Sequence, residues 1–448
     1  MRLDTDPYRS RYADRARDLA ASEIRALFSV VNRPEIVSFA GGMPDTTAMD
    51  LGPVAELTAA VVRDHGHTAL QYGGGQGREE LRELLVDVMA RGGAPATPDE
   101  LLVTVGGQQA LELIAKCFVD PGDVVLAEGP TYVGGVGALS SHQADLRHVP
   151  MDADGMRTDL LEEALAALKR EGRRAKYVYT IPNHQNPGGV SLSEERRVHL
   201  AELAEEHDLL LLEDGAYSLL DFEGHVGTSL RALVPDRVVY VGTMSKTFAP
   251  GVRTGWIAAP TPVRERLVVL REAADLCPGN LTQLVVERWL ATQPWEEQVA
   301  QYRALYAAKA RTMLDALAAE MPEEVAWTTP RGGMFVWVTV PRGIDTSALL
   351  AKAIVNRVAY VPGRGFFGDA QGGDALRLCF SYASVERIRE GVGRLAELLH
   401  AEIGLLRDVF GAGAPELAGR RGEPGITGGE QGGTAGTSRD PGLGWGVA

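Results

Sequence analysis

The chain has 448 residues, and 45% of them are hydrophobic, so it is long enough for a large α/β body with a smaller companion. Its formal net charge of −15 argues against a nucleic-acid-binding protein, because such binding depends on clustered Lys and Arg, and no basic run is present. The polar N-terminus lacks an apolar signal segment, and no uncharged stretch reaches the roughly 18 residues of a membrane span. We therefore expect a cytoplasmic protein whose three separated cysteines are reduced.

Apolar runs of strand length recur along the first 290 residues, and each ends in a cluster of Gly, Pro, Asn or Asp. These runs are Leu101–Val105, Val124–Ala127, Tyr177–Ile181, Leu209–Leu212 and Val238–Val241. Helical patterns lie between several of them, over Gln108–Phe118, Asp159–Arg170 and Ser193–His207. Strands that alternate with helices predict an α/β fold, a three-layer sandwich with a mostly parallel central sheet and helices on both faces.

The pattern changes after about residue 290. A long helical stretch is followed by three short apolar runs and a final helix, which predicts a smaller α+β domain. These segments are Trp295–Met321, Met334–Val340, Val358–Val361, Leu376–Phe380 and Val385–His400. We divide the chain into an N-terminal arm that is part of the small domain (1–50), a large domain (51–290), a small C-terminal domain (291–410) and a Gly-rich tail expected to be disordered (411–448).

Polar, aromatic or backbone-permissive residues follow the predicted strands. Ligands of open parallel sheets bind beyond the carboxyl ends of the strands, so these residues are candidates for one shared site. They are Gly107-Gln108-Gln109, Glu128–Tyr132, Pro182–Pro187, Glu213–Tyr217 and Thr243–Lys246. The set as a whole is more informative than any one of its members.

Lys246 lies in a segment that is otherwise low in charge. A partly buried lysine has a lowered pKa, which makes a free amine available for a Schiff base, although a lone lysine is more often a surface residue of a loop. Asp214 follows four leucines and Glu213, so its carboxylate starts at a buried strand end and needs a cationic or hydrogen-bonding partner. A protonated pyridine nitrogen would serve, and so would a helix N-terminus that Asp214 caps.

Three neighbouring residues fit a flat, polar ring. Tyr217 would reach the same site from one turn after Asp214, or it packs half-buried. Asn186, in Asn-Pro-Gly-Gly, either forms a turn or donates to a phenolic oxygen. Tyr132 either stacks on the ring or packs in the core. No metal-binding set is expected.

An anion would fit beside these residues. Glycines precede the helix that begins near Gln108, and free backbone N–H groups at a helix N-terminus attract phosphate, to which Ser245 and Arg253 would add a hydroxyl and a guanidinium. Arg377 lies inside an apolar strand. It either faces solvent or clamps a substrate carboxylate with two hydrogen bonds.

Taken together, these motifs resemble the fold-type-I, class I/II pyridoxal-phosphate-dependent aminotransferases over about residues 20–405. The N-terminal motifs are similar to those of the 2-aminoadipate aminotransferase branch. The first set comprises Asn186-Pro-Gly-Gly, Asp214-x-x-Tyr217, Ser245-Lys246, Arg253 and Arg377 before Cys-Phe-Ser. The second comprises Ala-Ser-Glu-Ile-Arg at 21–25, the run from Arg33 to Pro44, Tyr72-Gly-Gly-Gly-Gln-Gly and Gly107-Gln-Gln-Ala.

The resemblance implies a role for each candidate toward pyridoxal 5′-phosphate. Lys246 would carry the cofactor and move the proton, and Asp214 would pair with the pyridine nitrogen. Asn186 and Tyr217 would bind the ring oxygen, and Tyr132 would stack on the ring. The phosphate would be held by Gly107, Gln108, Ser245, Arg253 and Tyr72 of the partner subunit, which implies a homodimer with shared active sites.

For the substrate, the resemblance implies that Arg377 and Asn186 bind the α-carboxylate beside Gly42. Ser22 and Arg25 occupy the places that set selectivity on a mobile N-terminal helix covering the substrate, and Arg25 would favour a distal carboxylate or swing out. After Pro44 the sequence Asp-Thr-Thr-Ala-Met-Asp departs from the usual apolar pattern and alters the expected far end of the pocket. The expected reaction is ping-pong amino transfer between an L-amino acid and a 2-oxo acid, of 2-aminoadipate, aromatic or branched broad type or with a dedicated biosynthetic substrate.

Three alternatives remain to be weighed. A lyase or decarboxylase would use the same cofactor and fold. An aminotransferase-like transcription regulator needs a DNA-binding module of roughly 50 residues, but only about 20 precede the matching region. A NAD-dependent dehydrogenase is disfavoured because Gly73–Gly77 and Gly134–Gly137 do not fit Gly-x-Gly-x-x-Gly.

Overall fold

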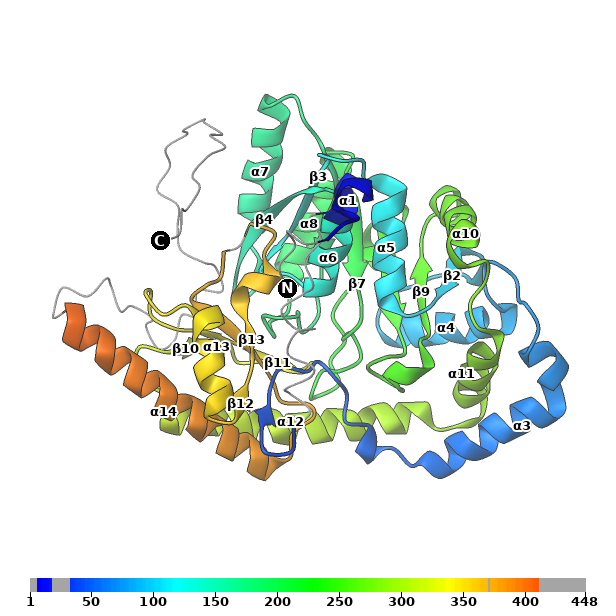
Figure 1. The fold of residues 1–448 in the computed structure, drawn as a ribbon. Coiled ribbons are helices and arrows are strands. Elements are labelled where there is room, and N and C mark those ends of the chain that lie inside the picture. Colours follow the sequence, from blue (N-terminus) through cyan, green and yellow to red (C-terminus); the bar gives the residue numbers. More distant parts are fainter. Residues whose placement is uncertain (1–5, 18–32, 370, 411–448) are drawn as a thin grey trace.

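The computed structural model describes residues 6–17, 33–369 and 371–410, and its centre is an eight-stranded sheet (Figure 1). The strand order is β2-β9-β8-β7-β6-β3-β4-β5. Strands β3, β4, β6, β7 and β8 pair in parallel, whereas β9 is antiparallel to β8 and β2, and β5 is antiparallel to β4. Their bounds are β2 Leu101–Thr104, β3 Val124–Gly129, β4 Asp145–Asp152, β5 Gly155–Met156, β6 Ala175–Thr180, β7 Leu210–Asp214, β8 Val238–Thr243 and β9 Gly255–Ala258.

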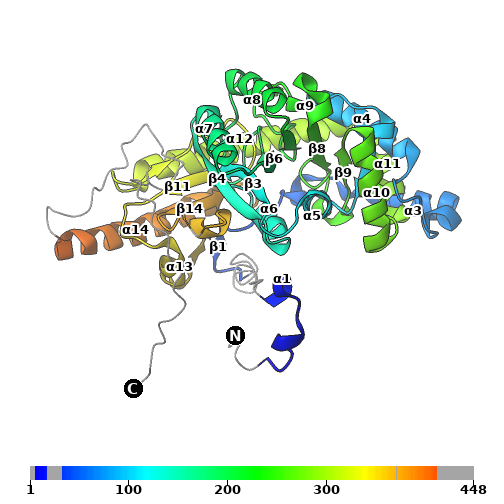
Figure 2. The ribbon, with the colours of Figure 1, turned by 90° about the horizontal axis from the view of Figure 1, so that it is seen from above.

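Helices cover both faces of this sheet, which explains why the central strands are apolar throughout. Figure 2 shows α7, α8 and α9 on one face and α5 and α6 on the other. These helices are α5 Gly107–Phe118, α6 Val133–Ser141, α7 Thr158–Arg170, α8 Glu194–Glu206 and α9 Leu230–Leu233. The predicted three-layer α/β fold is therefore confirmed.

The sequence also contains strands that the apolar-run criterion missed. Strand β4 carries polar residues, and most of it is only half-buried because it lies near the end of the sheet. Strand β9 is only four residues long and begins at Gly255. A Cβ atom on Gly255 would lie 2.7 Å from the backbone carbon of Gly106, so glycine is required where β9 passes this turn.

Four further helices pack beyond the β2 edge, on the right of Figure 1, where α3 lies against α11. They are α3 Leu51–Ala69, α4 Glu79–Arg91, α10 Thr261–Asp275 and α11 Asn280–Thr292. The short elements are α1 Asp14–Arg17 and the 3₁₀ turns η2 Arg9–Arg11, η3 Thr46–Ala48, η4 Pro98–Glu100, η5 Pro235–Arg237, η6 Pro250–Val252 and η7 Gly363–Phe366.

The C-terminal part forms the second, smaller unit on the left of Figure 1, built on a four-stranded antiparallel sheet of order β10-β11-β14-β13. The long helix α12 packs against α14, which continues to Phe410 rather than ending at His400 as expected. The bounds are α12 Trp295–Glu320, β10 Ala326–Trp327, β11 Phe335–Thr339, α13 Thr346–Val355, β13 Val361–Pro362, β14 Ala375–Cys379 and α14 Val385–Phe410. The predicted smaller α+β unit is confirmed.

The N-terminal arm joins this smaller unit. Strand β1 (Val37–Ser38) pairs in parallel with β12 (Val358–Ala359). We propose the division at residues 50, 290 and 410 on this basis. Ser22, Arg25 and the Gly-rich tail lie outside the described residues. The three cysteines are free, and no helix of the described part of the chain is long and apolar enough to span a membrane.

Candidate active site

A cavity of about 680 Å³ opens at the carboxyl ends of the central strands. Among the candidate residues that the structure describes, all except Tyr72 line this cavity. The residues that meet there are Gly42, Gly107, Gln108, Tyr132, Asn186, Asp214, Tyr217, Ser245, Lys246, Arg253 and Arg377. The rule that ligands bind beyond the strand ends therefore located the cavity correctly.

Lys246 lies in the turn that follows β8. Burial lowers the pKa of its amine to about 8, because the charged form loses hydration. Its Nζ donates a hydrogen bond of 2.6 Å to the carbonyl oxygen of Gly42. An amine whose pKa is lowered toward neutrality and that faces a cavity is suited to covalent attachment of a carbonyl compound and to proton transfer. Lys246 lines the cavity, so the alternative of a surface lysine is wrong.

Asp214 ends strand β7 and is 7% exposed. Burial raises the pKa of its carboxyl to about 6, although two hydrogen bonds favour the charged form. The Tyr179 hydroxyl donates to Oδ2 at 3.0 Å, and the Ala216 N–H donates to Oδ1 at 3.2 Å. Within the described residues no cationic side chain forms an ion pair with Asp214. The carboxyl caps a turn rather than a regular helix, and it has room for a protonated ring nitrogen.

A second group of side chains in the cavity lining forms a chain of hydrogen bonds. Arg377 Nη1 donates to Asn186 Oδ1 at 3.0 Å, and Asn186 Nδ2 donates to the Tyr217 hydroxyl at 3.2 Å. Arg377 is 3% exposed, so of the two alternatives for this residue the solvent-facing one is wrong. Its guanidinium lies 4.4 Å from the centre of the Phe335 ring, which also packs edge-on against Tyr217. Burial lowers the pKa of Arg377, yet a guanidinium stays charged.

A third group of lining residues forms a candidate anion cradle. Helix α5 begins at Gly107, directly after Gly106 at φ 78°, so its first N–H groups have no partner within the helix. A Cβ on Gly106 would lie 2.4 Å from Arg253 Nη2, which brings the guanidinium against this helix start. Ser245 Oγ accepts a hydrogen bond of 2.9 Å from the Thr243 hydroxyl. These groups could hold a phosphate through backbone, hydroxyl and guanidinium donors.

Tyr132 and Tyr72 differ sharply in position. The Tyr132 hydroxyl donates to Gln108 Oε1 at 3.4 Å, and burial raises its pKa, which leaves the ring neutral at the cavity wall. Tyr72 is 77% exposed and does not line this cavity. The structure therefore brings Tyr132 to the site and leaves Tyr72 on the surface of the chain.

Two contributors escaped sequence reasoning, and a third belongs to the candidate run Glu128–Tyr132 but was given no role of its own. Tyr179 and Phe335 lie in apolar strands, where the sequence predicts that an aromatic residue only packs in the core. The third, Glu128, is 1% exposed and accepts hydrogen bonds from the Thr180 hydroxyl, the Ile181 N–H and the Gln185 amide. Burial raises the pKa of Glu128 to about 7. A charged residue that ends an apolar strand was the available signal for Glu128.

The chain matches the family described as aminotransferase class I and II over residues 34–395. It belongs to that family. It is 39% identical to aromatic-amino-acid aminotransferase 1 of Thermococcus litoralis, over 90% of this chain and 97% of that protein. It is 36% identical to the 2-aminoadipate transaminase of Thermus thermophilus, over 87% and 96%.

A solved structure gives the same result for the fold. The kynurenine aminotransferase of Pyrococcus horikoshii, solved in complex with PMP, with KYN as substrates and KYA as products, aligns with a TM-score of 0.85 and 37% identity. The alignment covers 89% of this chain and 98% of that one. The recognition of a class I/II, pyridoxal-phosphate-dependent aminotransferase is therefore confirmed, and the lyase, regulator and dehydrogenase alternatives are not favoured.

The cavity fits this cofactor on its own chemistry. It offers an amine with a lowered pKa, a buried carboxyl that has no ion-pair partner within the described ranges, and a helix start beside Arg253. A protonated pyridine ring with an aldehyde and a phosphate complements each of these groups.

Proposed function

We propose that this aminotransferase works as a cytoplasmic homodimer in which Lys246 carries the cofactor, and that it transfers amino groups from aromatic, branched and 2-aminoadipate-like amino acids to 2-oxo acids. The observation that carries the assignment of residues is that the Lys246 amine, the Asp214 carboxyl and the Arg253 guanidinium line one cavity. The three free cysteines are compatible with a reducing compartment.

The residue roles follow from the groups that each side chain presents. Bound pyridoxal phosphate supplies an electron-withdrawing ring that stabilises negative charge at the α-carbon. Asp214 would keep the ring nitrogen protonated, and Asn186 and Tyr217 would bind the ring oxygen. Tyr132 would stack on the ring. Gly107, Gln108, Ser245 and Arg253 would hold the phosphate.

Lys246 would also act as the base. A pKa of about 8 leaves a useful fraction of the amine neutral near pH 7, so Nζ can take the proton from the α-carbon and return it elsewhere. Its hydrogen bond to the Gly42 carbonyl keeps the amine on the cavity side of its turn. In either direction of the reaction, Lys246 Nζ would hold the proton between its removal from one atom and its return to another.

Arg377 would bind the substrate's α-carboxylate together with Asn186. The guanidinium already lies in an apolar setting against Phe335, where an ion pair is stronger than in water. Its Nε is buried and has no hydrogen-bond partner among the described residues. An incoming carboxylate would supply that partner.

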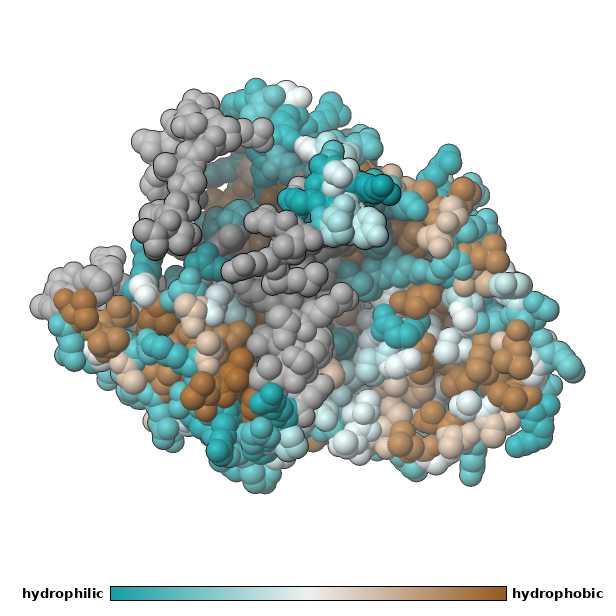
Figure 3. Space-filling view, viewed as in Figure 1, coloured by the Kyte–Doolittle hydropathy of each residue, from teal (hydrophilic) through white to brown (hydrophobic). Residues whose placement is uncertain are grey.

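Two surface features support a homodimer. Tyr72 is exposed, and the outer side of α3 carries a shallow groove lined mainly by apolar residues, from Leu51 to Val62. Figure 3 shows apolar surface on this side of the molecule. A second copy would cover such a patch, and Tyr72 of the partner subunit would reach the phosphate. Mixing Tyr72→Ala with Lys246→Ala protein tests this: only shared sites give hybrid dimers that recover activity.

The relatives' names support the proposed range of amino acids. Selectivity would rest on Ser22 and Arg25, with Arg25 pairing with a distal carboxylate or leaving space for a neutral side chain. A dedicated biosynthetic amino acid, such as an aryl-glycine or a guanidino amino acid, is the second candidate, since the chain is also 32% identical to the (S)-3,5-dihydroxyphenylglycine transaminase of Amycolatopsis orientalis over 86% of its length.

The test is an absorption spectrum followed by single-turnover titration. The panel contains 2-aminoadipate, glutamate, leucine, phenylalanine, an aryl-glycine and arginine. Conversion of the cofactor band with release of one equivalent of 2-oxo acid supports the proposal and ranks the donors. Release of ammonia or carbon dioxide instead would replace it with a lyase or a decarboxylase. Failure to bind pyridoxal phosphate would refute it.

A further inference from the structure

Two side chains of the proposed mechanism are held by the same short segment of backbone. Lys246 Nζ donates to the Gly42 carbonyl at 2.6 Å, and Arg377 Nη2 donates to the Ala40 carbonyl at 2.8 Å. Residues 40–43 also line the cavity directly. The base and the carboxylate-binding group are therefore held by the same backbone segment. A shift of that segment would move both side chains.

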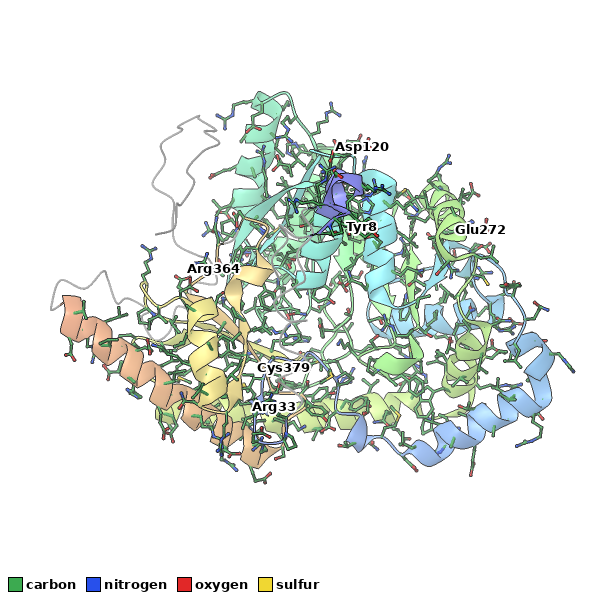
Figure 4. All side chains as sticks on the ribbon, viewed as in Figure 1. Tyr8, Arg33, Asp120, Glu272, Arg364 and Cys379 are labelled. Carbon is green, nitrogen blue, oxygen red and sulfur yellow. The ribbon has the colours of Figure 1, made fainter. Side chains whose placement is uncertain are left out.

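Strand-like hydrogen bonds hold the start of this segment, and side chains hold its end. The Cys379 N–H donates to the Phe39 carbonyl at 2.9 Å, where β14 ends (Cys379 is labelled in Figure 4). The Ser381 hydroxyl donates to the Met43 carbonyl at 2.6 Å. The Asp45 N–H donates to the Tyr306 hydroxyl of α12 at 3.1 Å.

A buried ion pair completes the attachment. Lys309, on α12, donates from Nζ to Asp45 Oδ2 at 2.7 Å and to the Ser381 carbonyl at 2.8 Å. The two side chains are 4% and 12% exposed. One ammonium thus binds both the end of the segment and the residue whose hydroxyl holds Met43.

Stability alone is a poor explanation for this pair. Removing two charges from water costs nearly as much as their attraction returns, and an apolar pair of similar size is often as stable. Apolar contacts are not directional. The hydrogen bonds from the Lys309 ammonium to two acceptors, by contrast, fix the position of the segment that ends at Asp45. Asp45 itself does not line the cavity, so the acidic residue that breaks the expected pattern after Pro44 is directed away from the substrate.

We infer that Lys309 and Asp45 are positioning residues, which fix residues 40–43 so that the Lys246 amine and the Arg377 guanidinium stand correctly toward the substrate. This inference rests on the proposed function of the site. Neither residue touches the cavity, and both act through the Gly42 and Ala40 carbonyls.

The test is the double variant Asp45→Asn/Lys309→Met, because changing one partner alone would bury an unpaired charge. The cofactor-binding groups lie on other elements, so cofactor content stays near one per chain. We expect kcat to fall roughly 10- to 100-fold, as for a displacement of about 1 Å at a reacting group. The KM for the amino acid rises, and the isotope effect of an α-deuterated amino acid on single turnover increases, because proton transfer becomes slower.

Two further variants separate positioning from general damage. Ser381→Ala removes the hydrogen bond to Met43, together with the 3.1 Å contact between the same hydroxyl and Cys379 Sγ. It remains informative if the double variant does not fold, and it should change kcat, KM and the isotope effect in the same direction by a smaller factor. Arg231→Met/Glu100→Gln removes another ion pair, which joins a buried guanidinium to a partly exposed carboxylate at 2.6 Å and lies outside the cavity lining. This control should lower thermal stability and leave the kinetic constants unchanged.

The inference is wrong if the folded double variant, or Ser381→Ala when the double variant does not fold, keeps kcat, KM and the isotope effect within about twofold of the parent. It is equally wrong if the Arg231 control loses as much kcat. Failure of the parent itself to transaminate would instead refute the proposed function, and the two failures are therefore distinguishable.

Discussion

Replacement of Tyr179 by Phe tests the electrostatics of Asp214 with a single oxygen atom. The hydroxyl donates to the carboxylate at 3.0 Å from a side chain that is 1% exposed, so no water takes its place. A hydrogen bond to a charged group contributes roughly 1.5–3 kcal/mol, which corresponds to a rise of about one to two in the pKa of the acid. Because burial already places the pKa of Asp214 at about 6, the variant carboxyl would be mostly protonated at pH 6.

Cofactor binding reports this change. A protonated ring nitrogen needs the ionised carboxylate, so the fraction of ionised Asp214 in the cofactor-free protein scales the affinity. We expect Tyr179→Phe to bind pyridoxal phosphate roughly 5- to 50-fold more weakly at pH 6, and almost as tightly as the parent near pH 8.5, where both carboxyls are ionised. The titration of Lys246 is common to both proteins and cancels in the ratio.

The assay is an equilibrium titration of cofactor-free protein, followed by cofactor absorbance at both pH values. Tyr177→Phe is the matched control, because Tyr177 lies on the same face of the same strand and is equally buried, but does not contact Asp214. An equal loss of affinity at pH 6 and pH 8.5, or an equal loss in the control, would refute the electrostatic explanation.

Three further outcomes are expected. Lys246→Ala should abolish turnover, measured as 2-oxo acid release, because it removes both the attachment point and the base; more than a trace of activity would show that another residue is the base. Arg377→Ala should raise the KM for the amino acid roughly 100-fold while cofactor content stays unchanged; a cofactor-free protein would contradict its role. The pKa of buried Glu128 is raised to about 7, so its contribution to folding stability is present below about pH 4.5 and is lost as the pH rises toward 7. Denaturant titrations should show that the free energy of unfolding falls less between about pH 4.5 and pH 7 in Glu128→Gln than in the parent. An equal fall in both proteins would be evidence that Glu128 does not titrate in this range.

The large sheet and most of the cavity could be predicted because their signals are local. Strands covered on both faces are apolar throughout, and each ends where polar residues must begin, as at Asp214 and Lys246. Strand β4 was missed because its half-buried residues include Asp145, Arg147 and His148. Its sequence therefore does not form an apolar run.

Other features depend on residues far apart in the chain. Asp45 and Lys309 are separated by 264 positions, so no local pattern relates them. The buried guanidinium of Arg377 donates to Ala40 and Asn186, which lie in two other segments of the chain. Tyr179 gave no signal because a tyrosine in an apolar strand is usually packed for its ring rather than used for its hydroxyl.

The strand order has a consequence for synthesis on the ribosome. Strand β2 has a single neighbour in the sheet, β9, which is made about 150 residues later and itself pairs with β8. The start of α5, which follows β2, can reach its final place only after residue 258 has emerged. Strand β1 must wait longer still, until residues 358–359 are available for pairing. The nascent chain therefore cannot capture the cofactor while its first half is being translated, and long-range pairing of this kind makes assembly slow.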